Sequence, residues 1–327
     1  MSSIVDHRIP VTILTGYLGA GKTTLLNHLI QQHPGKKFAI IENEFGDIGI
    51  DSELVVGLDG NNIFELSNGC ICCTLNDDLY KVLNRLLNSS KPFNHLFIET
   101  TGIADPSSVI QPFLADLDIQ MQFRMDGVIC LADCRLIEDI LKDEPEPTKQ
   151  LALADLVVIN KVSEVTEQYK QEVTGLINQI NPHAIKLYTD FARTEYPEIL
   201  NLNAFNPDNI EEQSKNIVAQ DHTHSPHGQA IKAHSFIIKG NLDFDKFSLF
   251  MDYFLTFNQN SIYRIKGIMS FNEVPHRMVA QSVKTMFLMT DGKPWKNYEI
   301  RESRIVFIGK YLDAEVIKEN LDSMLVY

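Results

Sequence analysis

The chain has 327 residues, of which 44% are hydrophobic and 22% charged, as expected for a globular protein long enough to form two domains. Its formal net charge of -14 argues against nucleic acid or an anionic membrane surface as the main partner. The sequence contains neither a run of about 20 apolar residues nor a signal-peptide pattern, so we expect a cytoplasmic protein without a membrane partner.

The first part of the chain alternates short apolar runs with amphipathic stretches. Continuous apolar runs of this length are typical of parallel strands buried on both faces, and they lie at residues 11–15, 38–41, 95–98, 127–131 and 156–159. Helical patterns separate them, at residues 23–32, 76–87 and 166–180. This alternation predicts an α/β, doubly wound domain over residues 1–200.

The rest of the chain has a different pattern. Residues 201–229 are rich in polar side chains and are predicted to be a linker. Strand patterns then lie at 233–238, near 269, at 282–289 and at 303–308, and helical patterns at 243–257 and 313–325. Mixed strands and helices without the repeated strand–helix–strand rhythm predict a smaller α+β C-terminal domain over residues 230–327.

Residues 16–23 carry the most specific motif of the chain. They read Gly-Tyr-Leu-Gly-Ala-Gly-Lys-Thr and match the phosphate-loop pattern G-x-x-x-x-G-K-[ST] between a predicted strand and a predicted helix. Backbone N–H groups of such a loop bind phosphate oxygens, while Lys22 reaches the β- and γ-phosphates and the Thr23 hydroxyl binds Mg²⁺. The expected nucleotide contacts here are Gly16, Gly19, Ala20, Gly21, Lys22, Thr23 and Thr24.

Two later motifs extend this site. Glu99 ends a strand three residues before Gly102, so we expect Glu99 to hold Mg²⁺ through water and the Gly102 N–H to meet the γ-phosphate. Asn160 and Lys161 stand where GTPases carry the guanine-reading N-K-x-D motif, but Ser163 replaces the aspartate. We therefore expect GTP as the nucleotide, with ATP or relaxed specificity as the alternative and Glu164 as a candidate substitute for the missing carboxylate.

Three of the five cysteines form a cluster, Cys70, Cys72 and Cys73. Clustered thiolates favour Zn²⁺, Cu(I) or Co²⁺, and Zn²⁺ takes a fourth ligand, for which Glu42 and Glu44 are candidates. Buried structural cysteines and a redox dithiol are the alternatives.

Taken in order, these motifs resemble the CobW-type P-loop GTPases, closest to the YjiA-like and zinc-chaperone branch. The resemblance rests on residues 15–24, 42–46, 68–73, 99–106 and 160–161, and on 263–267 and 304–309 near the C-terminus. It implies a GTP hydrolase that uses Mg²⁺, with Lys22, Thr23 and Glu99 in catalysis. It also implies that Glu42, Cys72 and Cys73, with Cys70 as a further candidate, bind Zn²⁺ for delivery to client metalloproteins.

Two other functions fit the same motifs: a non-catalytic, nucleotide-dependent zinc sensor or buffer, and a cobalt-handling protein for cofactor synthesis. His222, His224 and His227 in the predicted linker are candidates for collecting metal, with a solvated loop as the alternative. The sequence has no obvious glutamine to orient the attacking water, for which Glu44, Asp47 and Asp51 are candidates. It carries no signal for the oligomeric state.

Overall fold

The computed structural model describes residues 6–43, 63–68, 75–90, 92–143, 145–196, 199–215, 217 and 231–326. The chain divides into two compact units. The first consists of Met1–Gln150, Ala154–Val173 and Ile185–Asn203, and the second of Leu151–Leu153, Thr174–Ala184 and Ala204–Tyr327. No helix in the described part of the chain combines the length and apolarity that a membrane span requires.

The first unit is built on a seven-stranded parallel sheet with the strand order β3-β2-β4-β1-β5-β6-β7. Its strands are β1 (Ile9–Gly16), β2 (Phe38–Asn43), β3 (Ile63–Asn68), β4 (His95–Thr100), β5 (Phe123–Asp133), β6 (Leu156–Asn160) and β7 (Ile185–Thr189). The residues of β4 and β6 are buried throughout, which explains their continuous apolar sequence. The predicted α/β domain is therefore confirmed.

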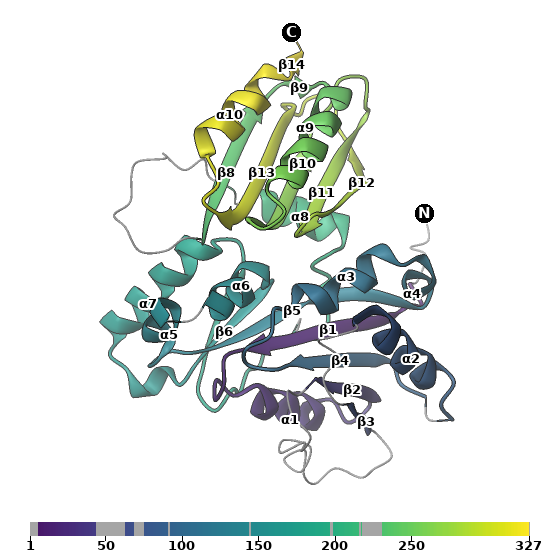
Figure 1. Cartoon of the computed structure of the whole chain (residues 1–327), viewed down its shortest axis with the longest axis vertical. Helices are drawn as coiled ribbons and strands as arrows, with labels where there is room; N and C mark the ends of the chain where they lie inside the picture. The colour runs from purple at the N-terminus through teal and green to yellow at the C-terminus, as the bar shows by residue number, and fades with distance from the viewer. Residues whose placement is uncertain are drawn as a thin grey trace. The chain divides into compact units, whose positions relative to one another are not determined.

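Helices connect these strands and cover both faces of the sheet (Figure 1). They are α1 (Lys22–Gln32), α2 (Leu75–Leu87), α3 (Ser107–Ala115), α4 (Leu117–Gln122), α5 (Ile137–Asp143), α6 (Pro145–Leu153) and α7 (Glu167–Ile180). From β1 the chain first moves to one side of the sheet, toward β2, and later to the other side, toward β5. The carboxyl end of β1 is thus a topological switch point, where open α/β sheets bind their ligands.

The second unit contains a five-stranded antiparallel sheet with the order β12-β11-β10-β13-β8. The strands are β8 (Ile231–Lys239), β10 (Ile262–Met269), β11 (His276–Val283), β12 (Met286–Pro294) and β13 (Glu302–Lys310). The helices are α8 (Pro207–Ser214), α9 (Phe244–Phe257) and α10 (Ala314–Ser323), and β9 (Asn241–Leu242) pairs with β14 (Leu325–Val326). Strands and helices mix here without parallel crossovers, which confirms the predicted α+β domain.

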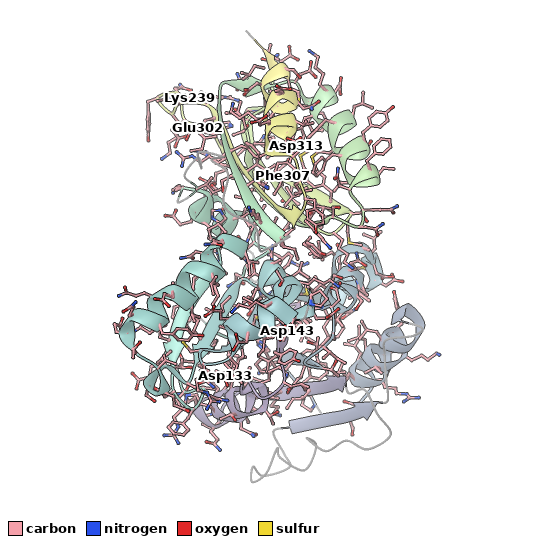
Figure 2. The ribbon with its side chains drawn as sticks, turned by 60° about the vertical axis from the view of Figure 1, so that its left-hand side comes forward. Asp133, Asp143, Lys239, Glu302, Phe307 and Asp313 are labelled. Carbon is pink, nitrogen blue, oxygen red and sulfur yellow. The ribbon has the colours of Figure 1, made fainter. Side chains whose placement is uncertain are left out.

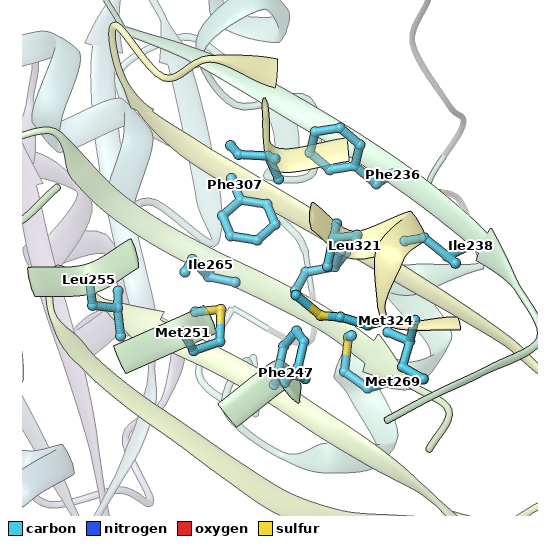
Figure 3. Close-up of a cluster of buried hydrophobic side chains, with 14 of the residues drawn as sticks. Phe236, Ile238, Phe247, Met251, Leu255, Ile265, Met269, Phe307, Leu321 and Met324 are labelled. Atoms are coloured by element: carbon cyan, nitrogen blue, oxygen red, sulfur yellow. The ribbon is translucent and has the colours of Figure 1, made fainter. Parts of the chain in front are cut away.

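One face of this sheet and the helices α9 and α10 enclose the main core of the second unit (Figure 3). Phe247 and Met251 of α9 lie one helical turn apart and are both fully buried there. Phe307 of β13 and Leu321 of α10 complete the same cluster. At the other end of α9, Phe257 is 81% exposed. Only some of the apolar residues of α9 therefore pack against the sheet.

Two elements differ from the sequence-based expectations. The helix α8 lies inside residues 201–229, where a linker is predicted, because Ile210 packs on Ile268 and Val279 of the sheet. The apolar run 282–289 spans the end of β11 and the start of β12. The turn between them has Lys284 at a φ of 52° and lacks the Asn-Gly signal of a tight hairpin. The predicted domain boundaries themselves stay a prediction.

The core of the second unit can be tested with two substitutions on α9. We expect Phe247→Ala to lower the free energy of unfolding by about 3–5 kcal/mol, because it leaves a cavity among buried side chains. The matched variant Phe257→Ala removes an exposed ring and should change it by at most about 0.5 kcal/mol. Urea unfolding followed by fluorescence of Trp295, the single tryptophan of the chain, measures both. Equal effects of the two variants would contradict the assigned core.

Candidate functional site

The loop between β1 and α1 has a backbone that only glycine adopts readily. Gly16, Gly19 and Gly21 have φ values of 135°, 73° and 108°. A Cβ on Gly16 would collide with the backbone of Leu131 in β5, so the backbone at the start of the loop lies in close contact with the neighbouring strand. Gly21 is the N-cap of α1 and has no side chain that could accept hydrogen bonds from the first N–H groups of the helix. The first N–H groups of α1 therefore remain for an anion.

Lys22 begins α1, and its ammonium group folds back over the loop. Its Nζ donates a hydrogen bond to the Gly16 carbonyl oxygen at 3.1 Å. Lys22 and Thr23 are half-buried and Thr24 is exposed, all in the first turn of the helix. The positive side chain thus lies across the same backbone whose N–H groups suit phosphate.

Glu99 and the residues after it lie beside this loop. Glu99 is buried, 8% exposed, near the carboxyl end of β4, and its backbone pairs with Leu14 of β1. The hydroxyl groups of Thr100 and Thr15 are 2.9 Å apart and join the ends of the two strands. A Cβ on Gly102 would lie 2.6 Å from the Leu18 backbone nitrogen, so the segment after β4 touches the phosphate loop.

Gln150 of α6 holds the segment after Glu99 in place. This buried side chain donates from Nε2 to the carbonyl oxygens of Gly102 at 3.0 Å and of Ala104 at 3.1 Å. The sequence does not single out Gln150, because one glutamine in a helix forms no motif with residues 46 and 48 positions away. Its role becomes visible only in the fold.

Asn160 fastens three segments together at the end of β6. Its Nδ2 donates to the Ala20 carbonyl oxygen of the phosphate loop at 2.9 Å. Its Oδ1 accepts from the Ala192 N–H at 2.8 Å and from the Thr189 hydroxyl at 3.2 Å. Asn160 is 2% exposed, so these bonds are shielded from water. The side chain therefore joins the phosphate loop to the segment after β7.

Lys161 has a left-handed backbone, with a φ of 63°, and its ammonium group lies over the phosphate loop. The Nζ donates to the Gly19 carbonyl oxygen at 2.9 Å and to Asp133 Oδ2 at 2.6 Å. Asp133, labelled in Figure 2, ends β5. Burial disfavours its charged form, yet hydrogen bonds from Arg135 and Lys161 hold the pKa of Asp133 below its usual value. Its carboxylate thus stays ionised and orients Lys161.

The residues that follow Lys161 form hydrogen bonds with two different neighbours. The Ser163 hydroxyl donates to Asp190 Oδ1 at 2.8 Å, and the Ser163 N–H donates to the same atom at 2.9 Å. Glu164, the candidate substitute for the missing aspartate, instead accepts from Arg135 at 2.7 Å. Asp190 follows β7, a strand that our sequence analysis does not predict because most of its residues are only partly buried.

The turn after β7 is strained. Phe191 and Ala192 have φ values of 55° and 52°, a conformation that costs a residue other than glycine on the order of 1–3 kcal/mol. The bond from the Ala192 N–H to Asn160 holds the turn, and Phe191 remains 74% exposed. Such strain marks candidate functional segments.

The predicted metal ligands and the candidates for orienting the attacking water lie mostly outside the described residues. This holds for Cys70, Cys72 and Cys73, for Glu44, Asp47 and Asp51, and for His222, His224 and His227. For Glu42 the structure describes the backbone alone, which pairs with Glu99 of β4 and Ser67 of β3. Among the described side chains, no three of the metal-binding types come close enough to hold an ion.

Known sequence families match two consecutive parts of the chain. The CobW/HypB/UreG nucleotide-binding domain matches residues 10–187, and the C-terminal domain of the cobalamin synthesis protein cobW matches residues 231–325. These matches confirm the resemblance based on the motifs.

Several named proteins are similar to the chain. The zinc chaperone YjiA of Escherichia coli is 31% identical over 314 residues, which cover 95% of this chain and 96% of that protein. The zinc-regulated GTPase metalloprotein activator 1 of Schizosaccharomyces pombe is 37% identical over 218 residues, 63% of this chain and 53% of the relative. The crystal structure of Zn(II)-bound YjiA GTPase from E. coli superposes with a TM-score of 0.73 at 25% identity, covering 98% of this chain and 99% of that one.

The contact between Gly102 and the phosphate loop leads to a test. We expect Gly102→Ala to weaken binding of a fluorescent GTP analogue with Mg²⁺ about tenfold or more, because the new Cβ pushes on the Leu18 backbone. Gly35→Ala is the matched control, since a Cβ there meets no atom within 4 Å. Fluorescence titration measures both. Unchanged binding in Gly102→Ala would show that this contact does not shape the site.

Proposed function

The chain belongs to the CobW/HypB/UreG family of nucleotide-binding proteins, and on this premise we propose that it hydrolyses GTP to GDP and phosphate in order to deliver Zn²⁺ to client metalloproteins. The observation that carries the proposal is the meeting of three segments at one edge of the parallel sheet. The phosphate loop touches the segment after Glu99 through Gly102, and it is tied to the Asn160-Lys161 pair through Ala20 and Gly19.

The phosphate half of the proposed mechanism follows from the loop. Backbone N–H groups between β1 and α1 bind the phosphate oxygens, and Lys22 exchanges its bond to the Gly16 carbonyl for the β- and γ-phosphates. Oxygen donors suit Mg²⁺, and the Thr23 hydroxyl would hold it directly and Glu99 through water. When bound, Mg²⁺ neutralises charge that develops on the phosphate oxygens. Gly102 positions its N–H at the γ-phosphate.

The proposed zinc site adjoins this machinery. Glu42 and Glu99 are paired residues on adjacent strands, and adjacent strands lie about 4.8 Å apart. Glu42, Cys72 and Cys73, with Cys70 as a further ligand, supply the carboxylate and thiolate donors that Zn²⁺ takes as cargo. A ligand bound at the end of β2 is therefore one strand away from the carboxylate assigned to Mg²⁺. Zinc occupancy and nucleotide state can influence each other over this distance.

Names of the relatives support the zinc and GTP assignments. The E. coli relative is called a zinc chaperone, and the S. pombe relative a zinc-regulated GTPase metalloprotein activator. We assign the same cargo and nucleotide to this chain, with client metalloproteins as partners. Slow intrinsic turnover that a client accelerates fits a GTPase whose water-positioning group is completed by a partner.

The phosphate-loop assignment can be tested by its lysine. We expect Lys22→Ala to reduce the rate of GTP hydrolysis by about a hundredfold or more, because charge on the γ-phosphate loses the cation that this side chain supplies. Lys37→Ala is the matched control, since Lys37 is exposed at the opposite, amino end of β2. Phosphate release under multiple turnover, measured with and without Zn²⁺, gives both rates. Hydrolysis that persists in Lys22→Ala would overturn the assignment, and binding without turnover in the wild type would favour a zinc sensor or buffer.

The zinc assignment has a separate test. We expect the wild type to bind about one Zn²⁺ per chain, and the double variant Cys72→Ser, Cys73→Ser to lose it, because serine does not replace a thiolate ligand. Cys134→Ala is the control, since that thiol is fully buried in the first unit. Metal analysis with competition between Zn²⁺ and Co²⁺ measures the outcome. Zinc retained by the double variant would place the site elsewhere, and tighter Co²⁺ binding would favour cobalt handling.

A further inference from the structure

We propose that Asp190 supplies the carboxylate that recognises guanine, in place of the aspartate that Ser163 replaces. This inference rests on the proposed GTPase function and names the residue that sets its base specificity. Guanine presents the N1–H and the N2 amino group side by side, and both are hydrogen-bond donors. A carboxylate can accept from both at once, whereas one hydroxyl cannot do so equally well.

The geometry brings a carboxylate to the position where the motif lacks one. Both the hydroxyl and the backbone N–H of Ser163 donate to Oδ1 of Asp190, at 2.8 and 2.9 Å. The carboxylate of Asp190 therefore lies one hydrogen bond beyond the Ser163 side chain. Among the described residues, Oδ2 of Asp190 receives no hydrogen bond, and Asp190 is only partly buried. That oxygen is available to a base.

Asp190 belongs to the same site as the phosphate loop. The residue before it, Thr189, and the second residue after it, Ala192, both donate to Oδ1 of Asn160. The other end of the Asn160 side chain donates to Ala20 of the phosphate loop. One buried carboxamide thus fixes the distance between the loop that binds phosphate and the turn that carries Asp190.

Other carboxylates near Ser163 are already engaged. Glu164 accepts from Arg135 at 2.7 Å, and Asp133 accepts from Lys161 and Arg135. Their charges are balanced by these cations, while the neighbours that hold Asp190 are a neutral hydroxyl and an amide. A serine at position 163 also fits this arrangement, because a second carboxylate there would repel Asp190.

Nucleoside diphosphates with altered bases test the inference. Inosine diphosphate lacks the N2 amino group of guanine, and xanthosine diphosphate has a carbonyl oxygen in its place. We expect the wild type to bind GDP about tenfold to a hundredfold more tightly than inosine diphosphate, as for a hydrogen bond to a charged group. Asp190→Asn should lose this preference and gain affinity for xanthosine diphosphate, because its new amide can donate to the carbonyl oxygen.

Glu164→Gln is the matched variant, since it removes the same charge from the rival carboxylate. We expect it to keep the wild-type ratio of GDP to inosine diphosphate affinity. Ser163→Ala removes one of the two donors to Asp190 and should reduce the ratio. Competition against a fluorescent GDP measures all four proteins, and thermal unfolding shows that each variant is folded. The wild-type ratio needs no substitution and tests the inference even if Asp190→Asn fails to fold.

Three outcomes would overturn the inference: no preference for GDP in the wild type, an unchanged preference in Asp190→Asn, or a preference lost only in Glu164→Gln. If the wild type still hydrolyses GTP in any of these cases, the proposed function stands and only the role of Asp190 falls. If the wild type neither binds nor hydrolyses GTP, the proposed function falls with it.

Discussion

The buried carboxamide of Asn160 is the interaction on which the described nucleotide site depends. It donates to the phosphate loop at Ala20 and accepts from the turn after β7 at Ala192. The same arrangement requires glycine at position 21, because a Cβ there would lie 2.7 Å from the Asn160 Nδ2. The bonds are shielded from water, so their geometry is held more firmly than surface contacts would allow. Two segments 172 positions apart, at Ala20 and Ala192, are thereby given one fixed spacing.

Charge around this centre is arranged in linked pairs. Asp133 is ionised although it is buried, because Arg135 and Lys161 donate to it, and Lys161 in turn reaches the phosphate loop. Arg135 is shared with Glu164, so Glu164 is held away from the Ser163 side of the motif. The cations near the proposed base-binding region are therefore orientated before any nucleotide enters. Preorganised charge of this kind loses little free energy to rearrangement on binding.

The segment after Glu99 is held from two directions. Gly102 lies against the Leu18 backbone, and Gln150 of α6 binds the carbonyl oxygens of Gly102 and Ala104. A segment that touches the phosphate loop on one side and a helix on the other is suited to transmit the presence of a γ-phosphate into the first unit. In the proposed function, this transmission couples GTP hydrolysis to metal transfer. The segment follows Glu99, and Glu99 pairs with the proposed zinc ligand Glu42 on the adjacent strand.

The sequence by itself determined the phosphate loop, the parallel α/β character of the first unit, the α+β character of the second unit and the family. These features are local: glycine spacing, continuous apolar runs and short motifs report the conformation of neighbouring residues. Only the tertiary structure decided the places of Gln150, Asp133 and Asp190, the packing of α8 on its sheet, and the hairpin between β11 and β12. Each depends on contacts between distant segments or on a turn without a sequence signal. The meaning of Ser163 shows the difference: the sequence shows a missing carboxylate, and the fold brings another one beside it from the end of β7.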